Sequence, residues 1–406
     1  MPDAFVKPFK GLLYNKTKIP DISACVCPPY DIIPDPLPYY HRSGCNAIRL
    51  ELPVGTPGSD MYDAAKKTLD TWLAEQVLTE DDRESVYLYE QEFLLHGQTR
   101  KRSGLIPLVR LDRHRILTHE ETRKEAREDR EKLIEKLHTF TSLILAMYED
   151  SSGEIGRLIE DSPKERIYDF IDELSIKNTF YRVADPTVTA RLAALMDEKI
   201  LYVADGHHRL SVALKLGLPY VAMYLTDMHA DGIAILPYHR VVSLNEKRED
   251  TQVLAAAAPY FDVVKVECPP RSGTDGLVEE ISSSSPLSFA LYFDGEKPSF
   301  YMLTQKKEMD FDPDNHRSLR RLKVNAVHKG VLKHLLKVQD DEISFLNSAD
   351  EAVRLVNSNQ YDFAVFVPAT SVEEVKDIAE NGLYMPPKST YFYPKVPTGL
   401  VFHKYA

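Results

Sequence analysis

Residues 200–217, ILYVADGHHRLSVALKLG, constrain the fold more than any other stretch of this 406-residue chain. The apolar run at its start predicts a buried strand, and residues 208–217 predict a helix that ends near Gly217. A connection between a strand and a helix needs only one or two polar residues. Here five consecutive positions carry an acid, a glycine, two imidazoles and a guanidinium: Asp205, Gly206, His207, His208 and Arg209. This density indicates a functional turn.

Strand-like and helix-like segments alternate along most of the chain, which predicts a mixed α/β protein. Its length exceeds the size at which one hydrophobic core usually stops growing, so we expect two or three domains, or one domain with a large insertion. Residues 85–95 and 103–111 read as two strands of a hairpin joined by the basic turn 96–102.

The overall charge limits the partners. A net charge of −12 and a pI near 5.6 give no general attraction to nucleic acids or acidic membranes. No run of 18 or more apolar residues occurs, and the N-terminus lacks the apolar core of a signal peptide. We therefore expect a cytoplasmic protein, with no membrane or nucleic-acid partner.

The turn at 205–209 has the composition of an anion site. A helix N-terminus has free N–H groups and a favourable dipole, Gly206 permits close approach of a ligand, and Arg209 offers a planar fork to phosphate. The histidines add donors or a proton carrier, and Asp205 could orient one of them or hold Mg²⁺. The alternative is a polar cap in which Asp205 caps the helix.

A charged helix is predicted to start at Thr118, with Glu121 in capping-box spacing. Its polar residues could line a cleft or could form a solvated helix face with ion pairs. The candidates for the cleft are His119, Glu120, Arg123, Asp129 and Arg130. The sequence HEETR lacks the second histidine of a zinc protease motif, so that reading is excluded.

Three other stretches carry candidate residues. Asp31 follows a proline pair that restricts the backbone, which suits a general base, although an ordinary turn explains it equally. His239 and Arg240 could make a second phosphate contact or lie on plain surface. The stretch 385–405 interleaves polar and aromatic residues as the closing wall of a cleft would: Lys388, Ser389, Thr390 and Lys395 with Tyr391, Phe392 and Tyr393.

Several of these patches, taken together, resemble one protein family. PFKG, PPYDII, HEET followed by Asp129-Arg130, ADGHHR, LPYHR and MPPKSTYFYPKVPTGLV occur in the order found in the domain of unknown function 1015 family. That family is similar to free-serine kinases of the ParB/sulfiredoxin superfamily, which carry the same DGHHR turn and a proline-lysine-threonine stretch like Pro387-Lys388-Ser389-Thr390.

The resemblance implies phosphoryl transfer from ADP or ATP, with Mg²⁺, to the hydroxyl of a small acceptor such as free L-serine. It implies that residues 205–209 hold the nucleotide phosphates and the transferred group, with His239, Arg240, Lys388, Ser389 and Thr390 as further nucleotide contacts. Asp31 would be the base, in place of a glutamate of the kinases. The catalytic set is then Asp31, Asp205, His207 and His208.

The resemblance also implies an architecture. Residues 1–84 would form the N-terminal part of a ParB/sulfiredoxin-like core, 85–185 an inserted α/β subdomain, 186–245 the rest of the core with the DGHHR turn, and 246–406 a C-terminal α/β region with a cleft-closing tail. The insertion could change the acceptor. Sulfiredoxin chemistry needs a cysteine in the equivalent turn, which this chain lacks.

Two other functions stay open. ParB relatives bind nucleotides and DNA, so a nucleotide-binding regulator or DNA-associated protein is the first alternative, against which the negative charge and the lack of a helix-turn-helix signature count. A hydrolase that uses the same histidines on a phosphodiester is the second. Release of inorganic phosphate without an acceptor would favour it.

Overall fold

The computed structural model describes residues 4–55, 60–266, 273–284, 286–294, 298–312 and 315–405. The chain folds into two compact units, the first made of Met1–Ala234 and Pro394–Ala406 and the second of Ile235–Tyr393. The second unit therefore interrupts the sequence of the first. Residues 85–185 lie within the first unit, and their separate identity as an inserted subdomain stays a prediction.

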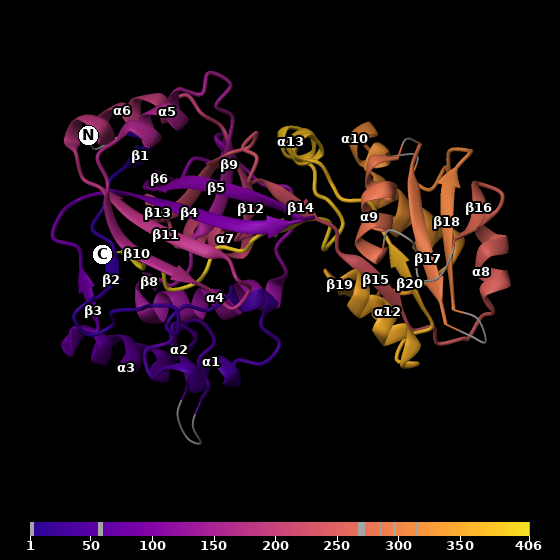
Figure 1. The fold of residues 1–406 in the computed structure, drawn as a ribbon, viewed down its shortest axis with the longest axis horizontal. Coiled ribbons are helices and arrows are strands. Elements are labelled where there is room, and N and C mark those ends of the chain that lie inside the picture. Colours follow the sequence, from indigo (N-terminus) through magenta and orange to yellow (C-terminus); the bar gives the residue numbers. More distant parts are fainter. Residues whose placement is uncertain are drawn as a thin grey trace. The chain divides into compact units, whose positions relative to one another are not determined.

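A large mixed sheet organises the first unit (Figure 1). Its strand order is β10-β11-β4-β5-β13-β9-β12-β7, and β6 joins β13 to β1. The bounds are β1 Val6–Lys7, β4 Val86–Leu95, β5 Gln98–Ile106, β6 Leu108–Arg110, β7 Ile116–Leu117, β9 Ile144–Tyr148, β10 Glu165–Ile171, β11 Lys177–Val183, β12 Leu201–Asp205 and β13 Tyr220–Asp227. Because β9 runs parallel to β13 and antiparallel to β12, the mixed α/β prediction is confirmed.

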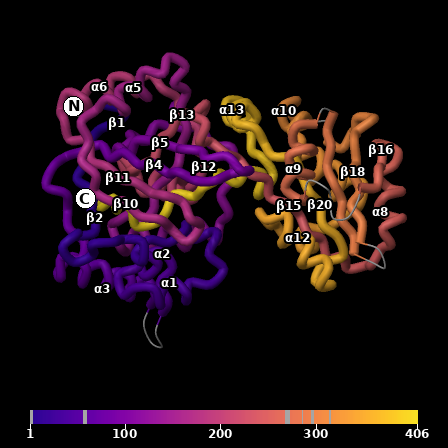
Figure 2. The backbone as a smooth tube through the Cα atoms, in the orientation of Figure 1, coloured from indigo at the N-terminus to yellow at the C-terminus, as the bar shows by residue number. Residues whose placement is uncertain are grey.

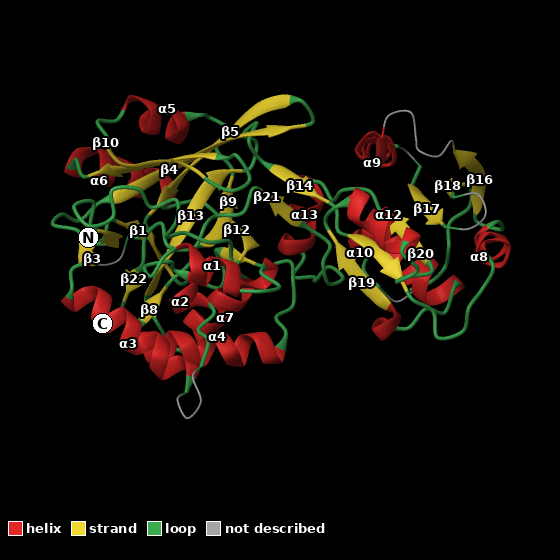
Figure 3. Cartoon of the chain, turned by 60° about the horizontal axis from the view of Figure 1, so that its bottom comes forward, coloured by secondary structure: helices red, strands yellow, loops and turns green. Residues whose placement is uncertain are grey.

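Helices cover this sheet, and two short ribbons complete the unit. α3 packs against α4, and α4 against α7, which in turn lies on β9 (Figure 3). The helices are η1 Tyr30–Ile32, α1 Leu37–Arg42, α2 Ile48–Glu51, α3 Met61–Ala74, α4 Lys124–Leu137, α5 Glu154–Asp161, α6 Pro186–Met196 and α7 His207–Lys215. The ribbons pair β2 Leu12–Tyr14 with β3 Leu78–Glu80, and β8 Thr139–Phe140 with β22 His403–Lys404.

The last segment of the chain is woven into the first unit. Thr398 pairs with Cys27 and Phe402 with Leu12 as isolated bridges, before β22 pairs with β8. Figure 2 shows this yellow segment among the indigo and magenta elements of the unit. Its buried apolar side chains, such as Leu400 and Phe402, belong to the core of that unit, so it is an integral part of the fold.

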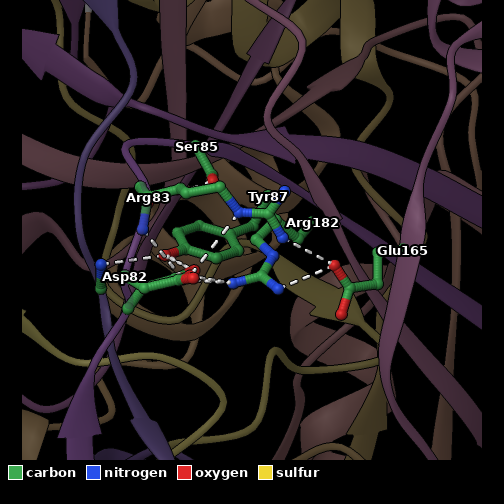
Figure 4. A network of polar contacts seen from close by, with 8 residues as sticks. Asp82, Arg83, Ser85, Tyr87, Glu165 and Arg182 are labelled. Atoms are coloured by element: carbon green, nitrogen blue, oxygen red, sulfur yellow. Dashed lines mark hydrogen bonds and ion pairs between the residues drawn. The ribbon is translucent and has the colours of Figure 1, made fainter.

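An ion-pair network fastens the β10–β11 hairpin beside β4 (Figure 4). The Arg182 guanidinium contacts Asp81 and Asp82, and it donates to Glu165 at 2.7 Å. Arg83 donates to the same Glu165 carboxylate at 3.0 Å. The network joins two guanidiniums to three carboxylates through shared partners, and we read it as structural.

The second unit is an antiparallel sheet in the order β16-β18-β17-β20-β15-β19. α9 packs on β17, and α12 packs on β15 and β20. The strands are β14 Ala234–Leu236, β15 His239–Val242, β16 Phe261–Val266, β17 Ser288–Phe293, β18 Ser299–Gln305, β19 Ile343–Leu346, β20 Phe363–Phe366 and β21 Tyr391–Tyr393, with β14 and β21 as a separate ribbon. The helices are α8 Asp250–Ala257, α9 Gly273–Ser283, α10 Arg317–Arg321, α11 Lys323–Asn325, the π-helix η2 Ala326–Leu335, η3 Asp340–Glu342, α12 Ala349–Asn357 and α13 Val372–Glu380.

No helix within the described ranges combines the length and the apolar character needed to cross a membrane.

Candidate functional site

The turn between β12 and α7 has the expected strand–glycine–helix geometry. Gly206 is the N-cap of α7 and has the left-handed backbone, φ 89°. A β-carbon at this position would lie 3.0 Å from both Nε and Nη2 of Arg209, so only glycine leaves the guanidinium where it is. No described side chain caps α7. The N–H groups of its first turn therefore stay available to a ligand.

Asp205 does not cap the helix, so the alternative of a plain polar cap is wrong. One oxygen of its carboxylate accepts from Lys395 Nζ at 2.7 Å, and the other accepts from Arg209 Nη2 at 3.1 Å. Burial raises the pKa of Asp205, but Lys395 and Arg209 outweigh it and hold the pKa well below its usual range. The acid is therefore ionised and anchors two cations at the turn.

Lys395 was predicted only as part of the closing wall 385–405, and neither as a catalytic nor as a nucleotide-binding residue. It belongs to the C-terminal segment, 190 residues from Asp205 in sequence, and its backbone carbonyl accepts from Gln91 Nε2 at 3.1 Å. The only signal in the sequence was its position in the polar and aromatic stretch 385–405. Nothing in that stretch indicated Asp205 as its partner.

Two buried imidazoles meet beside the turn. The rings of His207 and His119 pack edge to face, with their centroids 4.8 Å apart. Burial lowers the pKa of His207 to about 4 and the pKa of His119 to about 3, so both rings are neutral at pH 7. Nε2 of His207 is buried and has no hydrogen-bond partner among the described groups. A buried polar atom of this kind points to a ligand or water that completes it.

Arg209 has a similar unmet donor. Its side chain is 4% exposed, and Nε has no hydrogen-bond partner within the described part of the chain. Since the guanidinium also contacts Asp205, it is held in place before any ligand arrives. Arg209 Nε and the first N–H groups of α7 are donors, and His207 Nε2 donates in one of the two neutral tautomers of its ring. We call this set of groups the α7 anion cradle.

His208 lies at the edge of the cradle, near two acids. Its Nε2 accepts from the backbone N–H of Arg123 at 3.0 Å. Burial lowers the pKa of His208, while Glu120 and Asp31 act in the opposite direction. Asp31 itself is exposed, in η1. The structure thus brings Asp31, Glu120 and His119 to the same turn as residues 205–209.

Asp129 and Arg130 form a neighbouring cluster. Arg130 is buried, donates to the Glu51 carbonyl at 2.7 Å and holds Asp129 at 2.9 Å through Nε. Its Cζ lies 4.3 Å from the centre of the Tyr30 ring. These contacts tie α4 to α2 and η1, so the two residues position the segment that carries Asp31.

The helix predicted from Thr118 begins only at Lys124, with Arg123 as its N-cap. His119 and Glu120 therefore lie in a loop, where His119 can reach His207. The reading as a solvated helix face is wrong for His119 and Arg130, which are both almost wholly buried.

Five predicted nucleotide contacts lie in the second unit. His239 packs its ring on Phe366, and Arg240 is wholly buried, with Cζ 5.3 Å from the Phe345 ring. Lys388 lies 5.0 Å from the Tyr238 ring, and Ser389 donates to the Pro386 carbonyl at 2.7 Å. Thr390 is partly buried just before β21. Their contact with a nucleotide stays a prediction.

The cradle suits an anion better than a metal ion. Arg209 Nε and the first N–H groups of α7 are donors, and both oxygens of Asp205 already accept from cations. Among the residues that the structure describes, no cluster of three or more His, Cys, Asp or Glu could hold a metal ion. Phosphate oxygens accept hydrogen bonds and carry charge, as this donor set requires.

The sequence model of a family described as "Protein of unknown function (DUF1015)" matches residues 6–331. No curated protein matches. A conserved hypothetical protein from Pyrococcus furiosus is 16% identical, over 72% of this chain and 93% of its own, with a TM-score of 0.36.

Two further solved structures are similarly distant. A free serine kinase in complex with AMP is 15% identical, over 70% of this chain and 86% of its own, with a TM-score of 0.37. SbnI with a C-terminal truncation, from Staphylococcus aureus, is 11% identical, over 73% and 86%, with a TM-score of 0.38. TM-scores of this size do not establish a shared fold.

Proposed function

The chain belongs to the DUF1015 family, as its motifs predicted, and from the α7 anion cradle we propose that it is a phosphotransferase that uses ADP or ATP and a small hydroxylated acceptor. The family description assigns no function. The proposal is built on groups of the first unit.

The observation that carries the proposal is the unmet donor set at the start of α7. His207 Nε2 and Arg209 Nε are buried without partners among the described groups, next to the first N–H groups of the helix. A protein leaves buried donors unmet at a cost of about 1–3 kcal/mol each, unless a ligand or water completes them. A phosphate group of a nucleotide would complete all of them together.

This arrangement supplies what phosphoryl transfer requires. The bond between the terminal phosphorus and its bridging oxygen breaks, a new bond forms to the acceptor oxygen, and the charge on the phosphoryl oxygens is stabilised by positioned donors. Arg209 and the neutral His207 would serve as those donors. The Asp205–Lys395 pair would keep Arg209 oriented, since Asp205 holds the guanidinium through its second oxygen.

The acceptor hydroxyl must lose its proton during this step. Asp31 is the exposed carboxylate beside His208, so we assign it as the base, and Glu120 lies close to the same imidazole. A magnesium ion would enter bound to the nucleotide phosphates rather than in a site built by the protein. The motif resemblance to free-serine kinases supports L-serine as the first acceptor to test.

Phosphorus NMR of the full chain tests the proposal. The protein is incubated with Mg²⁺, ATP or ADP, and a pool of amino acids and hydroxylated metabolites that includes L-serine. We expect a new phosphomonoester that needs the acceptor. Intact nucleotide in every sample would overturn the proposal, and inorganic phosphate released without acceptor would replace it by the hydrolase.

Three variants locate the activity. Arg209→Gln should abolish turnover and weaken nucleotide binding, while Arg191→Gln, on the exposed surface of α6, is the matched control. Asp31→Asn should spare nucleotide binding and lower turnover by about 10²–10⁴-fold, the usual contribution of a general base. Asp31 is exposed, so Asp31→Asn should fold. It therefore still tests whether the activity belongs to this site in the case that Arg209→Gln does not fold.

A further inference from the structure

The first unit contains a cavity of about 700 Å³ that shares no lining residue with the α7 anion cradle. We call it the β1–α6 cavity, because its walls come from residues 4–10 around β1 and from one face of α6, with β22 at one side. Small-molecule sites in proteins usually have volumes of about 300–1,000 Å³. The cavity is therefore large enough for a metabolite.

One wall of the cavity is apolar and made of small side chains. Pro186, Thr189, Ala190 and Ala193 of α6 line it, at a spacing that places them on one helix face. α6 packs against β1 on this side. Large aliphatic residues at these positions would fill the space, so the small ones leave it open. Val6, Phe9 and Leu108 extend the apolar surface.

The polar part of the lining carries three cations and two acids. Lys7, Lys10 and Lys404 face the cavity, together with the acids Glu80 and Glu84. The Lys7 ammonium lies 3.7 Å from the centre of the Tyr220 ring, which holds it in place. No ion pair with a described residue neutralises any of the three lysines, so their charges are available to a ligand.

His403 adds an oriented donor. Its ring is buried and lies between Phe9 and Phe140, with centroid distances of 5.9 Å to each. Its Nδ1 accepts from the Ala222 N–H at 3.4 Å, so in the neutral ring the proton is on Nε2. Burial and then Lys7 lower the pKa of His403 to about 4, which keeps the ring neutral at pH 7.

We propose that the β1–α6 cavity binds a small organic anion, whose apolar body lies on the α6 wall and whose carboxylate or phosphate contacts Lys7, Lys10, Lys404 and His403. The apolar wall and the cations are both needed for such a ligand. The proposal is independent of phosphoryl transfer, because the two sites have no residue in common.

Calorimetric titration of the full chain tests the proposal with three probes that share an eight-carbon alkyl chain. Octanoate and octyl phosphate carry the two anionic groups, and octanol is neutral; each is used below its micelle concentration. We expect one saturable site for at least one anion and at least tenfold weaker binding of octanol. The comparison of the two anions tells which group the cavity prefers.

Matched variants on α6 assign the site. Ala190→Trp places an indole in the cavity and should abolish binding, whereas Ala194→Trp adds the same ring at an exposed position of the helix and should leave it unchanged. Lys10→Glu, at an exposed position, should weaken anion binding at least tenfold. Nucleotide affinity, measured on the same variants, should not change.

Two outcomes would overturn the proposal: no probe binds the wild-type chain, or Ala190→Trp binds the anions as tightly as Ala194→Trp does. The failure of phosphoryl transfer would be seen separately, as intact nucleotide in the NMR experiment on the wild-type chain. A chain that binds octanoate but transfers no phosphate would retain this site and lose only the proposed function.

Discussion

At the scale of single residues, the two glycines at the ends of α7 have different roles. Gly206 has φ 89° and no room for a β-carbon beside Arg209, whereas Gly217 has φ 65° and open space around it. Gly206→Ala and Gly217→Ala should therefore both cost about 1–2 kcal/mol of stability through left-handed strain. Only Gly206→Ala should also weaken nucleotide binding, because it displaces the guanidinium.

Thermal unfolding and nucleotide titration of both variants check this prediction. Equal nucleotide affinities in the two variants would show that the position of Arg209 does not depend on the glycine. The contact with Arg209 that requires glycine at position 206 could not be predicted from the sequence. That Gly206 permits close approach of a ligand to the backbone could be predicted.

Lys395 gives a second prediction at this scale. Lys395→Met leaves the largely buried Asp205 with Arg209 alone, and the loss of one partner of a buried pair typically costs about 3–5 kcal/mol. The double variant Lys395→Met/Asp205→Asn should lose less stability than the two single variants summed. Denaturant unfolding of the four proteins measures this coupling, and strict additivity would contradict it.

The residue scale also marks a limit of the sequence analysis. Asp205, Gly206 and Arg209 could be predicted because they are contiguous and the turn imposes their proximity. Lys395 could not be predicted as a partner of Asp205, because the two residues are far apart in sequence and only the tertiary fold brings them together. Residues 239–240 and 388–390 were joined to the site by their residue types and by the resemblance, and their contact with a nucleotide stays a prediction.

At the scale of elements, local signals were sufficient where no distant contact competed with them. The β4–β5 hairpin was predicted, but with the wide turn 96–102. In the structure β5 already starts at Gln98, because His96 and Gly97 both have positive φ and make a two-residue turn. The predicted start of α4 at Thr118 was wrong for a different reason. The residues before Lys124 form a loop, because His119 and Arg123 contact α7 there.

The corrected start of α4 is itself testable. Thr118 caps no helix, so Thr118→Ala should change stability by less than about 0.5 kcal/mol. Ser371→Ala is the comparison, because Ser371 and Glu374 form a capping box at the start of α13 and the loss of such a cap costs about 1 kcal/mol. Equal losses in denaturant unfolding would indicate that Thr118 has a role in the loop.

At the scale of the whole molecule, buried histidines link stability to pH. Burial is the main cause that lowers the pKa of five of them below the usual 6.5, to about 3 or about 4: His119, His207, His239, His328 and His403. The unfolded chain gains protons as the pH falls through about 6.5, whereas the folded chain does not. Stability should therefore be complete above about pH 6.5 and fall toward pH 4, by up to about 1.4 kcal/mol per pH unit and histidine.

Unfolding by urea between pH 8 and pH 4.5 measures this slope. His328→Gln should flatten it, whereas His114→Gln, at an exposed position, is the matched control. A stability that is constant or rises as the pH falls would contradict the prediction.

The overall α/β class was predictable from the alternation of segments. The division into these two units was not, because it depends on residues 394–406 joining the first unit again.

The return of residues 394–406 has a consequence for biosynthesis. The second unit is translated between the two parts of the first, and Lys395 is translated after both. On the ribosome the second unit has all its residues before the first does, and the β8–β22 ribbon of the first unit forms only after β22 has been made. The Asp205–Lys395 pair can form only once residues 394–406 have left the exit tunnel, so until then Asp205 in the nascent chain has Arg209 as a partner and lacks its second cation.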